Sequence, residues 1–541
     1  MMHASEFTRE GKSLKPEACI GTPRGAGEAR VIIGPGEEGA MAGSIAAARC
    51  WDEWRARRLA SFEERALARS FRPVEPENLM MAEEMGTAVS APSALSATPG
   101  ASPVEVRVAP DTLARWLAND QDLGHSHEPP STSIASPGTS RSSSSSSTRV
   151  RLFSSNDYLG MSTHSAVRIA AARAALAHGS GPRSSALVCG YTPEHSKLER
   201  ALASLKGTEE CILFSSGYAA NCGVIPALCD DDTCEIFSDA LNHASIVDGC
   251  ALAKRKGTRV TLYPHGDTST LSRLVRESRA KRIMVITDSL FSMDGDFAPL
   301  IEITSMKREE NARCGRARVM VMVDEAHATL VCGQGGNGGG AASMFDVSDE
   351  IDVSIGTMSK AIGSHGGFVA CSESMKRVLA SSARSAIFST SLPAPVIAAA
   401  SAALEVDRDV GREARTKLYA RIDAFAAACA GRIRSRHVAN TCGKMTDDAV
   451  NEWRGVFVTR KSPVVSVVVG SESVALRASA ELLRRGFHVP AIRPPTVPAN
   501  TCRLRVALSA SHGLEDVREL ASAVGDLVSG DAVGSAAKAK L

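Results

Sequence analysis

The sequence carries almost no net charge, because its 62 lysines and arginines are balanced by 60 aspartates and glutamates. A chain without a charge excess gives no electrostatic reason to expect binding to nucleic acid or to an anionic membrane surface. The 14 cysteines never occur as C-x-x-C, which argues against zinc ribbons and thioredoxin-type sites, and no metal site is expected. Dispersed cysteines in a long chain favour reduced thiols and an intracellular protein.

Long apolar runs and two familiar phosphate motifs are also missing. No stretch reaches the roughly 20 apolar residues of a transmembrane helix, and the first residues lack the apolar segment of a secretory signal. The letters DEAH at 324–327 do not indicate a helicase, because no G-x-x-x-x-G-K-[ST] loop exists in the chain. Gly333, Gly335 and Gly338 match G-x-G-x-x-G, but no helical pattern follows them, so a dinucleotide site is not expected.

The chain of 541 residues is longer than one hydrophobic core normally serves, and two or more folded units are expected. Residues 1–149 are predicted to form an N-terminal extension, with one helical segment at about 44–69 and a serine-rich linker that is too polar to order itself. From residue 150, apolar strands alternate with helical patterns, which indicates an α/β fold with a mostly parallel sheet. We predict a first catalytic segment at 150–195, a large domain at 196–395, a smaller domain at 396–530 and a flexible tail at 531–541.

Several polar residues follow these predicted strands. Lys360 lies among small and apolar residues in GTMSKAIGSHGG, where an unpaired ammonium is costly. Asp324 follows five apolar residues and needs a cationic partner or strong donors; a structural carboxylate satisfied by backbone amides is the alternative. Gly217 opens a helical pattern after a strand, where backbone amides can bind a phosphate, although most such junctions only turn the chain.

Two further residues are candidates for the functional site, and each also has a purely structural interpretation. His243 lies between a strand and a helical stretch, and a lone histidine there is more often structural than catalytic. Arg493 precedes two prolines that rigidify its segment, which suits bidentate carboxylate binding or, alternatively, a structural salt bridge. A lysine, a buried acid, a phosphate-type helix start, a histidine and an arginine together are what pyridoxal phosphate (PLP) chemistry requires.

Nine segments in order then resemble the α-oxoamine synthase family of fold-type I PLP enzymes, over residues 150–528. They are FSSNDYLG, ALVCGYTPEHSKLE, SSGYAAN, NHAS, FSMDGDFAPL, VDEAHATL, GTMSKAIG, FSTSLPAP and IRPPTVP. The resemblance implies a large PLP-binding domain with a mostly parallel sheet and a smaller C-terminal α+β domain. Within the family, the chain looks most like plant-type members that join pimeloyl-CoA to L-alanine in biotin biosynthesis. Ser184 departs from a run that is commonly richer in glycine.

The resemblance also implies roles by position. Lys360 would bind PLP covalently and remove the substrate Cα proton, Asp324 would pair with the pyridine nitrogen, and His243 would stack on the ring. The remaining cofactor and substrate contacts would come from His327 and Ser292 at the phenolic oxygen, from Gly217, Tyr218, Thr357 and the neighbouring subunit's Thr390 at the phosphate, and from Arg493, Asn156 and Thr496 at the substrate.

Other functions stay open at this point. A sister synthase that uses glycine or serine shares the whole cofactor apparatus, whereas a fold-type I aminotransferase fits the family's motifs less well. An inactive partner subunit would typically lack the lysine that Lys360 supplies. The resemblance implies a homodimer, and the terminal Ala539-Lys540-Leu541 resembles a peroxisomal import signal, so a peroxisomal receptor is an expected partner and the cytoplasm is the alternative location.

Overall fold

The computed structural model describes residues 52–61, 104–108, 113–114, 117, 148–429 and 455–528, apart from Pro495. The predicted tail at 531–541 lies outside these residues, as do most of the serine-rich stretch and all but 52–61 of the predicted helical segment at 44–69. Within the described part of the chain, no helix is both long and apolar enough to cross a bilayer. The domain boundaries given above stay predictions.

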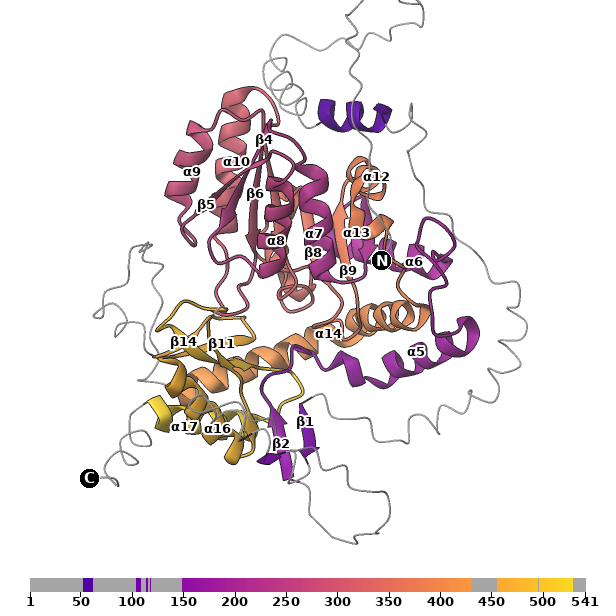
Figure 1. The fold of residues 1–541 in the computed structure, drawn as a ribbon. Coiled ribbons are helices and arrows are strands. Elements are labelled where there is room, and N and C mark those ends of the chain that lie inside the picture. Colours follow the sequence, from indigo (N-terminus) through magenta and orange to yellow (C-terminus); the bar gives the residue numbers. More distant parts are fainter. Residues whose placement is uncertain are drawn as a thin grey trace, which may run out of the picture.

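The large sheet has seven strands in the order β3-β9-β8-β7-β6-β4-β5 (Figure 1). All neighbours pair in parallel except β9, which is antiparallel to both β3 and β8. The expectation of a mostly parallel sheet is therefore confirmed. The strands are β3 (Glu210–Phe214), β4 (Cys234–Asp239), β5 (Arg259–Tyr263), β6 (Arg282–Asp288), β7 (Val319–Asp324), β8 (Val353–Thr357) and β9 (Gly367–Cys371).

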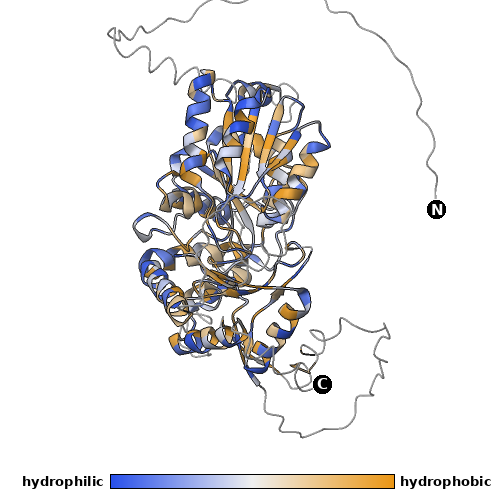
Figure 2. Cartoon of the chain, turned by 90° about the vertical axis from the view of Figure 1, so that its left-hand side faces the viewer, coloured by the Kyte–Doolittle hydropathy of each residue, from blue (hydrophilic) through white to orange (hydrophobic). Residues whose placement is uncertain are grey.

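Helices cover both faces of this sheet, because its strands are apolar on both faces. In β6, for example, Met284 and Ile286 belong to one buried cluster while Ile283 and Val285 belong to another. The cluster with Met284 packs against α7 (Gly217–Leu228), α8 (Ala244–Lys254) and α12 (Glu373–Ser382), and the other against α9 (Thr268–Glu277) and α10 (Leu300–Cys314). Hydrophobic residues are accordingly concentrated in the strands, as the orange arrows of Figure 2 show.

A second, smaller sheet forms near the C-terminus. Its four antiparallel strands run in the order β10 (Gly455–Val458), β11 (Val464–Gly470), β14 (Cys502–Ala507) and β13 (Ala491–Ile492). Helices α16 (Glu472–Arg484) and α17 (Leu514–Val528) belong with it, and the 35-residue helix α14 (Ala394–Ala428) shares its core. This arrangement confirms the expected smaller α+β domain.

The first part of the catalytic region contacts this smaller domain. Strand β2 (Thr148–Leu152) pairs with β1 (Glu105–Val108) on one side and with β12 (Phe487–His488) on the other. The remaining elements are α5 (Ser165–His178), α6 (Pro193–Lys206), α11 (Ala341–Met344), α13 (Arg384–Ile387) and short 3-10 turns at Met161–Thr163, Gln334–Gly336 and Ser348–Glu350.

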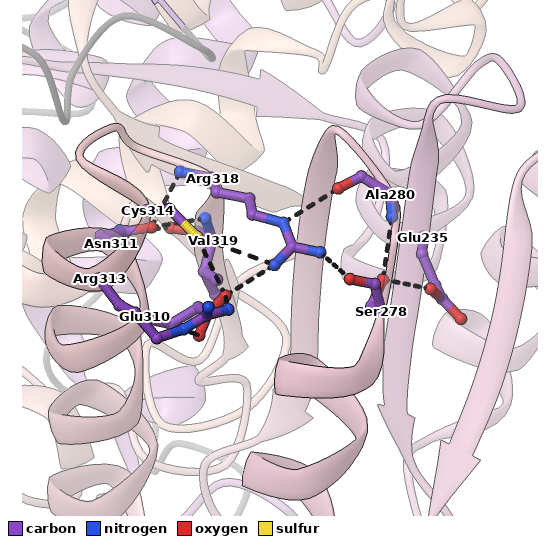
Figure 3. Close-up of polar contacts among 9 residues, drawn as sticks. All are labelled: Glu235, Ser278, Ala280, Glu310, Asn311, Arg313, Cys314, Arg318 and Val319. Carbon is purple, nitrogen blue, oxygen red and sulfur yellow. Dashed lines mark hydrogen bonds and ion pairs between the residues drawn. The ribbon is translucent and has the colours of Figure 1, made fainter.

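Polar contacts anchor the amino end of β7, which is the end opposite Asp324. The Arg318 guanidinium donates to Glu310 Oε1 at 2.6 Å and to the carbonyls of Ala280 and Ser278 (Figure 3). Asn311 Oδ1 accepts the backbone N–H groups of Arg318 and Val319. The strand therefore enters the sheet at a fixed point, and its carboxyl end is placed accordingly.

Helix 52–61 lies against the same end of the large domain. Trp54 and Leu59 pack on the core cluster beneath α7 and α8. The guanidinium of Arg282 lies 4.6 Å from the Trp54 ring centre, and Arg58 forms a 2.8 Å ion pair with Asp230. Part of the N-terminal extension is therefore docked on the catalytic region.

Candidate active site

The carboxyl ends of β6, β7 and β8 meet at one edge of the large sheet. Asp288 ends β6, Asp324 ends β7, and these two are partners in the parallel register. Thr357 ends β8, which pairs beside β7. Three parallel strands therefore deliver polar side chains to one place, as expected for a ligand site in an open α/β sheet.

Asp324 is buried and held by donors rather than by a cation. Asn221 Nδ2 donates to its Oδ2 at 2.7 Å, and the backbone N–H of Ala326 donates to its Oδ1 at 2.9 Å. Both carboxylate oxygens thus accept hydrogen bonds. A carboxylate at this place can pair with a protonated ring nitrogen.

Asp288, the neighbouring acid, has a strongly raised pKa. Burial raises the pKa of its carboxyl well above the usual range, and the neighbouring charge of Asp324 raises this pKa further. Its Oδ2 accepts the backbone N–H of His243 at 3.0 Å. The two adjacent strand-end acids therefore have different surroundings: Asp324 accepts two hydrogen bonds, whereas burial and the neighbouring Asp324 raise the pKa of Asp288.

Lys360 lies in the turn between β8 and β9, where small residues let the chain pass close to its neighbours. A Cβ added at Gly363, whose φ is +71°, would lie 2.3 Å from the backbone nitrogen of Ser162. Among the described residues, no hydrogen bond or ion pair holds the Lys360 amine. Burial lowers the pKa of this amine to about 8, against the opposing charges of Asp324 and Asp288. The amine is therefore partly neutral near physiological pH, which makes it a nucleophile and a base.

His243 caps the amino end of α8. Its Nδ1 accepts the backbone N–H of Ser245 at 3.2 Å and lies 2.8 Å from Ser245 Oγ. Burial lowers the pKa of the ring. His243 is thus a neutral imidazole beside the two acids and Lys360.

His327 is joined to Asn156 through a tyrosine that the sequence did not single out. His327 Nδ1 lies 2.7 Å from the hydroxyl of Tyr158, which donates to Asn156 Oδ1 at 3.1 Å. Burial lowers the pKa of His327 well below its usual value, with the positive charges of Lys360 and Arg505 adding to the effect. The two predicted residues therefore share one hydrogen-bond network.

Arg505, in β14 of the smaller domain, completes this network. Its guanidinium donates to the Ser292 carbonyl at 2.5 Å, to Asn156 Oδ1 at 3.2 Å and to the Tyr158 hydroxyl at 3.3 Å. Both Arg503 and Arg505 are buried and alternate along one strand in CRLRVA. The sequence carried a signal for these buried arginines, because they alternate with apolar residues along strand β14.

The start of α7 lies next to the end of β8. Gly217 and Tyr218 are the first residues of the helix, so their amide groups have no acceptor within it. A Cβ added at Gly217 would lie 3.3 Å from the Thr357 Cβ. The predicted phosphate contacts Gly217, Tyr218 and Thr357 are therefore neighbours, while the Tyr218 ring extends outward and its hydroxyl bonds Asp248.

Three predicted residues lie apart from this cluster. Arg493 forms a 2.9 Å ion pair with Glu472 at the surface, and the backbone N–H of Thr496 donates to the Arg493 carbonyl. Thr390 is exposed and bridges Ser185 in its own chain. Within the described residues, no hydrogen bond or ion pair joins Arg493, Thr496 or Thr390 to Lys360 or Asp324, so their roles stay predictions. Ser184, where the sequence departs from the glycine-richer run of the family, accepts the backbone N–H of Ser391 at its carbonyl. It therefore lies beside the segment that carries Thr390.

The family of class I and II aminotransferases matches residues 148–524. The chain belongs to this family.

Relatives of this aminotransferase-family chain include an 8-amino-7-oxononanoate synthase of Arabidopsis thaliana, which is 40% identical over 78% of this chain and 82% of the relative. The synthase of the same name from Geobacter sulfurreducens is 42% identical over 69% of this chain and 88% of the relative.

Solved structures agree on the fold. A serine palmitoyltransferase with PLP superposes with a TM-score of 0.62 at 27% identity, over 72% of this chain and 89% of that one. The 8-amino-7-oxononanoate synthase of Francisella tularensis has a TM-score of 0.55 at 23% identity, over 71% and 98% of the two chains. This last likeness concerns the fold alone.

The residues of this aminotransferase-family chain fit PLP. Lys360 supplies an amine without a partner in the described residues, Asp324 a carboxylate whose two oxygens accept hydrogen bonds, and Gly217 a close backbone approach at a helix start. Covalent attachment, a ring-nitrogen partner and a phosphate anchor are the three features that PLP needs.

Proposed function

We propose that the chain is an 8-amino-7-oxononanoate synthase with PLP as its cofactor. It would join the acyl group of pimeloyl-CoA, or of another pimeloyl carrier, to L-alanine and release 8-amino-7-oxononanoate, CoA and CO2. The observation that carries this proposal is the 40% identity to the Arabidopsis synthase over 82% of that protein. The Lys360 amine beside Asp324 supports it.

Bound PLP supplies an electron sink for the electron pair that is released when a bond to the substrate Cα breaks. Lys360 would hold the cofactor and would take the substrate Cα proton at Nζ. A pKa near 8 suits this role, because a base is most effective when its pKa lies close to the working pH. Asp324 would pair with the ring nitrogen, and the amides of Gly217 and Tyr218 would hold the phosphate.

The smaller domain contributes to the substrate side. Arg493 forms a surface ion pair with Glu472, and such a pair is worth little, so its guanidinium can exchange partners for a substrate carboxylate. Asn156 is held by Arg505 and Tyr158, which gives its amide a fixed orientation. These residues bind and orient the amino acid while Lys360 moves the proton.

The nearest alternative is a sister synthase, because the solved neighbours at 27–28% identity include serine palmitoyltransferases. The purified protein should be assayed with alanine, glycine and serine, each against pimeloyl-, acetyl-, succinyl- and palmitoyl-CoA. We expect the highest kcat/KM for alanine with pimeloyl-CoA. A higher value for glycine with acetyl-CoA, or for serine with palmitoyl-CoA, would overturn the proposal.

We also propose that the enzyme is a homodimer in which Thr390 serves the partner's phosphate site. The bridge between Ser185 and Thr390 brings two segments together, and each carries an exposed apolar side chain: Val188 is 70% exposed and Phe388 67%. Exposed apolar residues that gather on adjacent segments mark interaction surfaces. Light scattering should give twice the chain mass, and an active monomer would contradict this.

The third proposal is import into peroxisomes through Ala539-Lys540-Leu541, which lie outside the described residues. A small residue, a base and leucine at the free carboxylate are what the import receptor reads.

A further inference from the structure

A line of hydrogen bonds connects Asp324 with His243 through two residues that end the segments SSGYAAN and NHAS and have no role assigned above. Asn221 Nδ2 lies 2.7 Å from Asp324 Oδ2 and 3.0 Å from Ser245 Oγ, and Ser245 Oγ lies 2.8 Å from His243 Nδ1. Asn221 is 0% exposed and Ser245 1%. The line therefore runs through the interior, between α7 and α8, where water does not compete with it.

The direction of each hydrogen bond follows from the chemistry of the groups. An amide nitrogen only donates, and the two shortest contacts of Asn221 Nδ2 are to Asp324 and to Ser245, with a longer one of 3.4 Å to the Gly217 carbonyl. The Ser245 hydroxyl accepts a hydrogen of this amide, so its own hydrogen goes to His243 Nδ1. The backbone N–H of Ser245 also donates to Nδ1, at 3.2 Å. His243 Nδ1 is therefore the unprotonated nitrogen, and the ring carries its hydrogen on Nε2.

The backbone of His243 is fixed from the other side. Its N–H donates to Asp288 Oδ2 at 3.0 Å, and the preceding Asn242 accepts the backbone N–H of Asp288 at 2.8 Å. Asn242 Nδ2 also donates to the carbonyl of Ile286 in β6. The backbone N–H and the Nδ1 atom of His243 are thus both hydrogen-bonded within the protein, and Nε2 is the ring nitrogen that can contact a ligand.

We propose that Ser245 and Asn221 are positioning residues that hold His243 in the Nε2–H tautomer and tie its orientation to the carboxylate of Asp324. The proposal rests on the proposed function, in which His243 faces the cofactor ring. With Nε2 protonated, His243 offers a hydrogen-bond donor to the reacting groups and no lone pair. It therefore orients and stabilises, while Lys360 remains the base.

The test uses the full-length holoenzyme and the exchange of the alanine Cα hydrogen in D2O without any acyl-CoA. Ser245→Ala should lower the exchange kcat about tenfold, below the roughly 10²–10⁴ of a full acid or base, and leave the alanine KM unchanged. Ser245→Thr, which keeps a hydroxyl, should recover most of the rate. Ser471→Ala removes a comparable helix-cap serine from α16 and should leave the exchange rate at the wild-type level.

Asn221→Ala and the double variant test whether the two residues act in series. If they do, Asn221→Ala with Ser245→Ala should be no slower than the slower single variant. Multiplicative losses, a wild-type rate in Ser245→Ala, or no recovery in a folded Ser245→Thr would each overturn the proposal. If the wild type exchanges glycine or serine but not alanine, the proposed function fails, and the same variants measured with that amino acid still decide the positioning role.

Discussion

Lys360 and its two neighbouring acids show how single residues are prepared for chemistry. The amine is buried and has a pKa of about 8, because desolvation outweighs the attraction of Asp324 and Asp288. Only the unprotonated amine can bond to an aldehyde. Its reactivity should therefore depend on pH in the range where cells work.

Lys360→Ala should abolish turnover and leave a folded protein without the absorbance of covalently bound cofactor. In the wild type, capture of PLP by the apoprotein should speed up as pH rises through about 8, because the amine loses its proton there. Stopped-flow absorbance measures both effects. Lys197→Ala, at an exposed lysine with a weak partner, should leave both unchanged, and normal activity in Lys360→Ala would contradict the assignment.

Asp288 and Asp324 should respond differently to the same isosteric change. Burial raises the pKa of Asp288 and so favours its neutral form, which Asn mimics, so Asp288→Asn should change kcat less than about threefold. Asp324→Asn removes the proposed partner of the ring nitrogen and should cost at least about 100-fold.

The pH dependence of protein stability gives an independent measure of the raised pKa of Asp288. The native state keeps the Asp288 proton, while the unfolded chain releases it above about pH 3.9. Wild-type stability is therefore lost as pH rises from that value toward the raised native pKa. Thermal denaturation should show Asp288→Asn more stable than the wild type at pH 8, with the gain shrinking toward pH 5. A gain that does not depend on pH would count against a neutral Asp288.

At the scale of elements, the glycine-rich loop at 333–340 lies against the residue that follows strand β7, next to Asp324. Glu325, the next residue, forms a buried ion pair with Lys206 of α6 and accepts the backbone N–H of Ala342 at 2.8 Å. Gly340 has φ +105°, and a Cβ there would lie 2.1 Å from Glu325 Oε2. Gly340 thus lets the loop pass close to the Glu325 carboxylate of this ion pair.

Gly340→Ala should destabilise the protein by about 3 kcal/mol or more, because breaking a buried ion pair leaves a charge uncompensated. Gly315→Ala is the matched control: its φ is +61° and nothing lies within 4 Å of an added Cβ, so only the backbone strain of about 1 kcal/mol applies. Urea denaturation compares the two. Equal losses would show that the ion pair with Lys206 is not what the glycine protects.

Helix and strand types could be read from the sequence because each depends on local pattern. Asp324 after five apolar residues and Lys360 among glycines were both recognisable at strand ends. Tyr158, Asn221 and Ser245 were not, because their roles come from contacts with residues of other elements, and for Arg505 the sequence showed only its alternation with Arg503. Arg505 is 347 residues from Tyr158 in the chain, and no local period reports such a contact. The surface partner of Arg493 escaped for the same reason.

At the scale of the whole molecule, the two folded parts are joined where the site lies. Arg503 forms a buried ion pair with Asp294, and Arg505 bonds the Ser292 carbonyl, so one strand of the smaller domain holds the loop that follows β6. A Cβ at Gly295 would lie 2.3 Å from the Val464 carbonyl, which shows how closely loop and sheet approach. The active site therefore depends on both parts being present.

The C-terminal residues should act independently of this core. A fluorescent protein fused ahead of the last ten residues should become punctate in cells and coincide with a peroxisomal marker. Removing Leu541 should return it to the cytosol, because the receptor reads the terminal leucine and its carboxylate. Diffuse fluorescence from the intact tail would contradict peroxisomal import.

The pairing of β1 with β2 has a practical consequence for protein engineering. Val108 and Thr148 are direct partners in an antiparallel pair, whose Cα atoms lie about 5 Å apart, and Leu113 and Leu117 still pack on the same small cluster. The described residues on either side of the stretch 118–147 therefore belong to one small part of the structure. A reporter domain whose own ends lie close together could be inserted there without separating the strands, so that catalysis and a fluorescent signal would be carried by one chain.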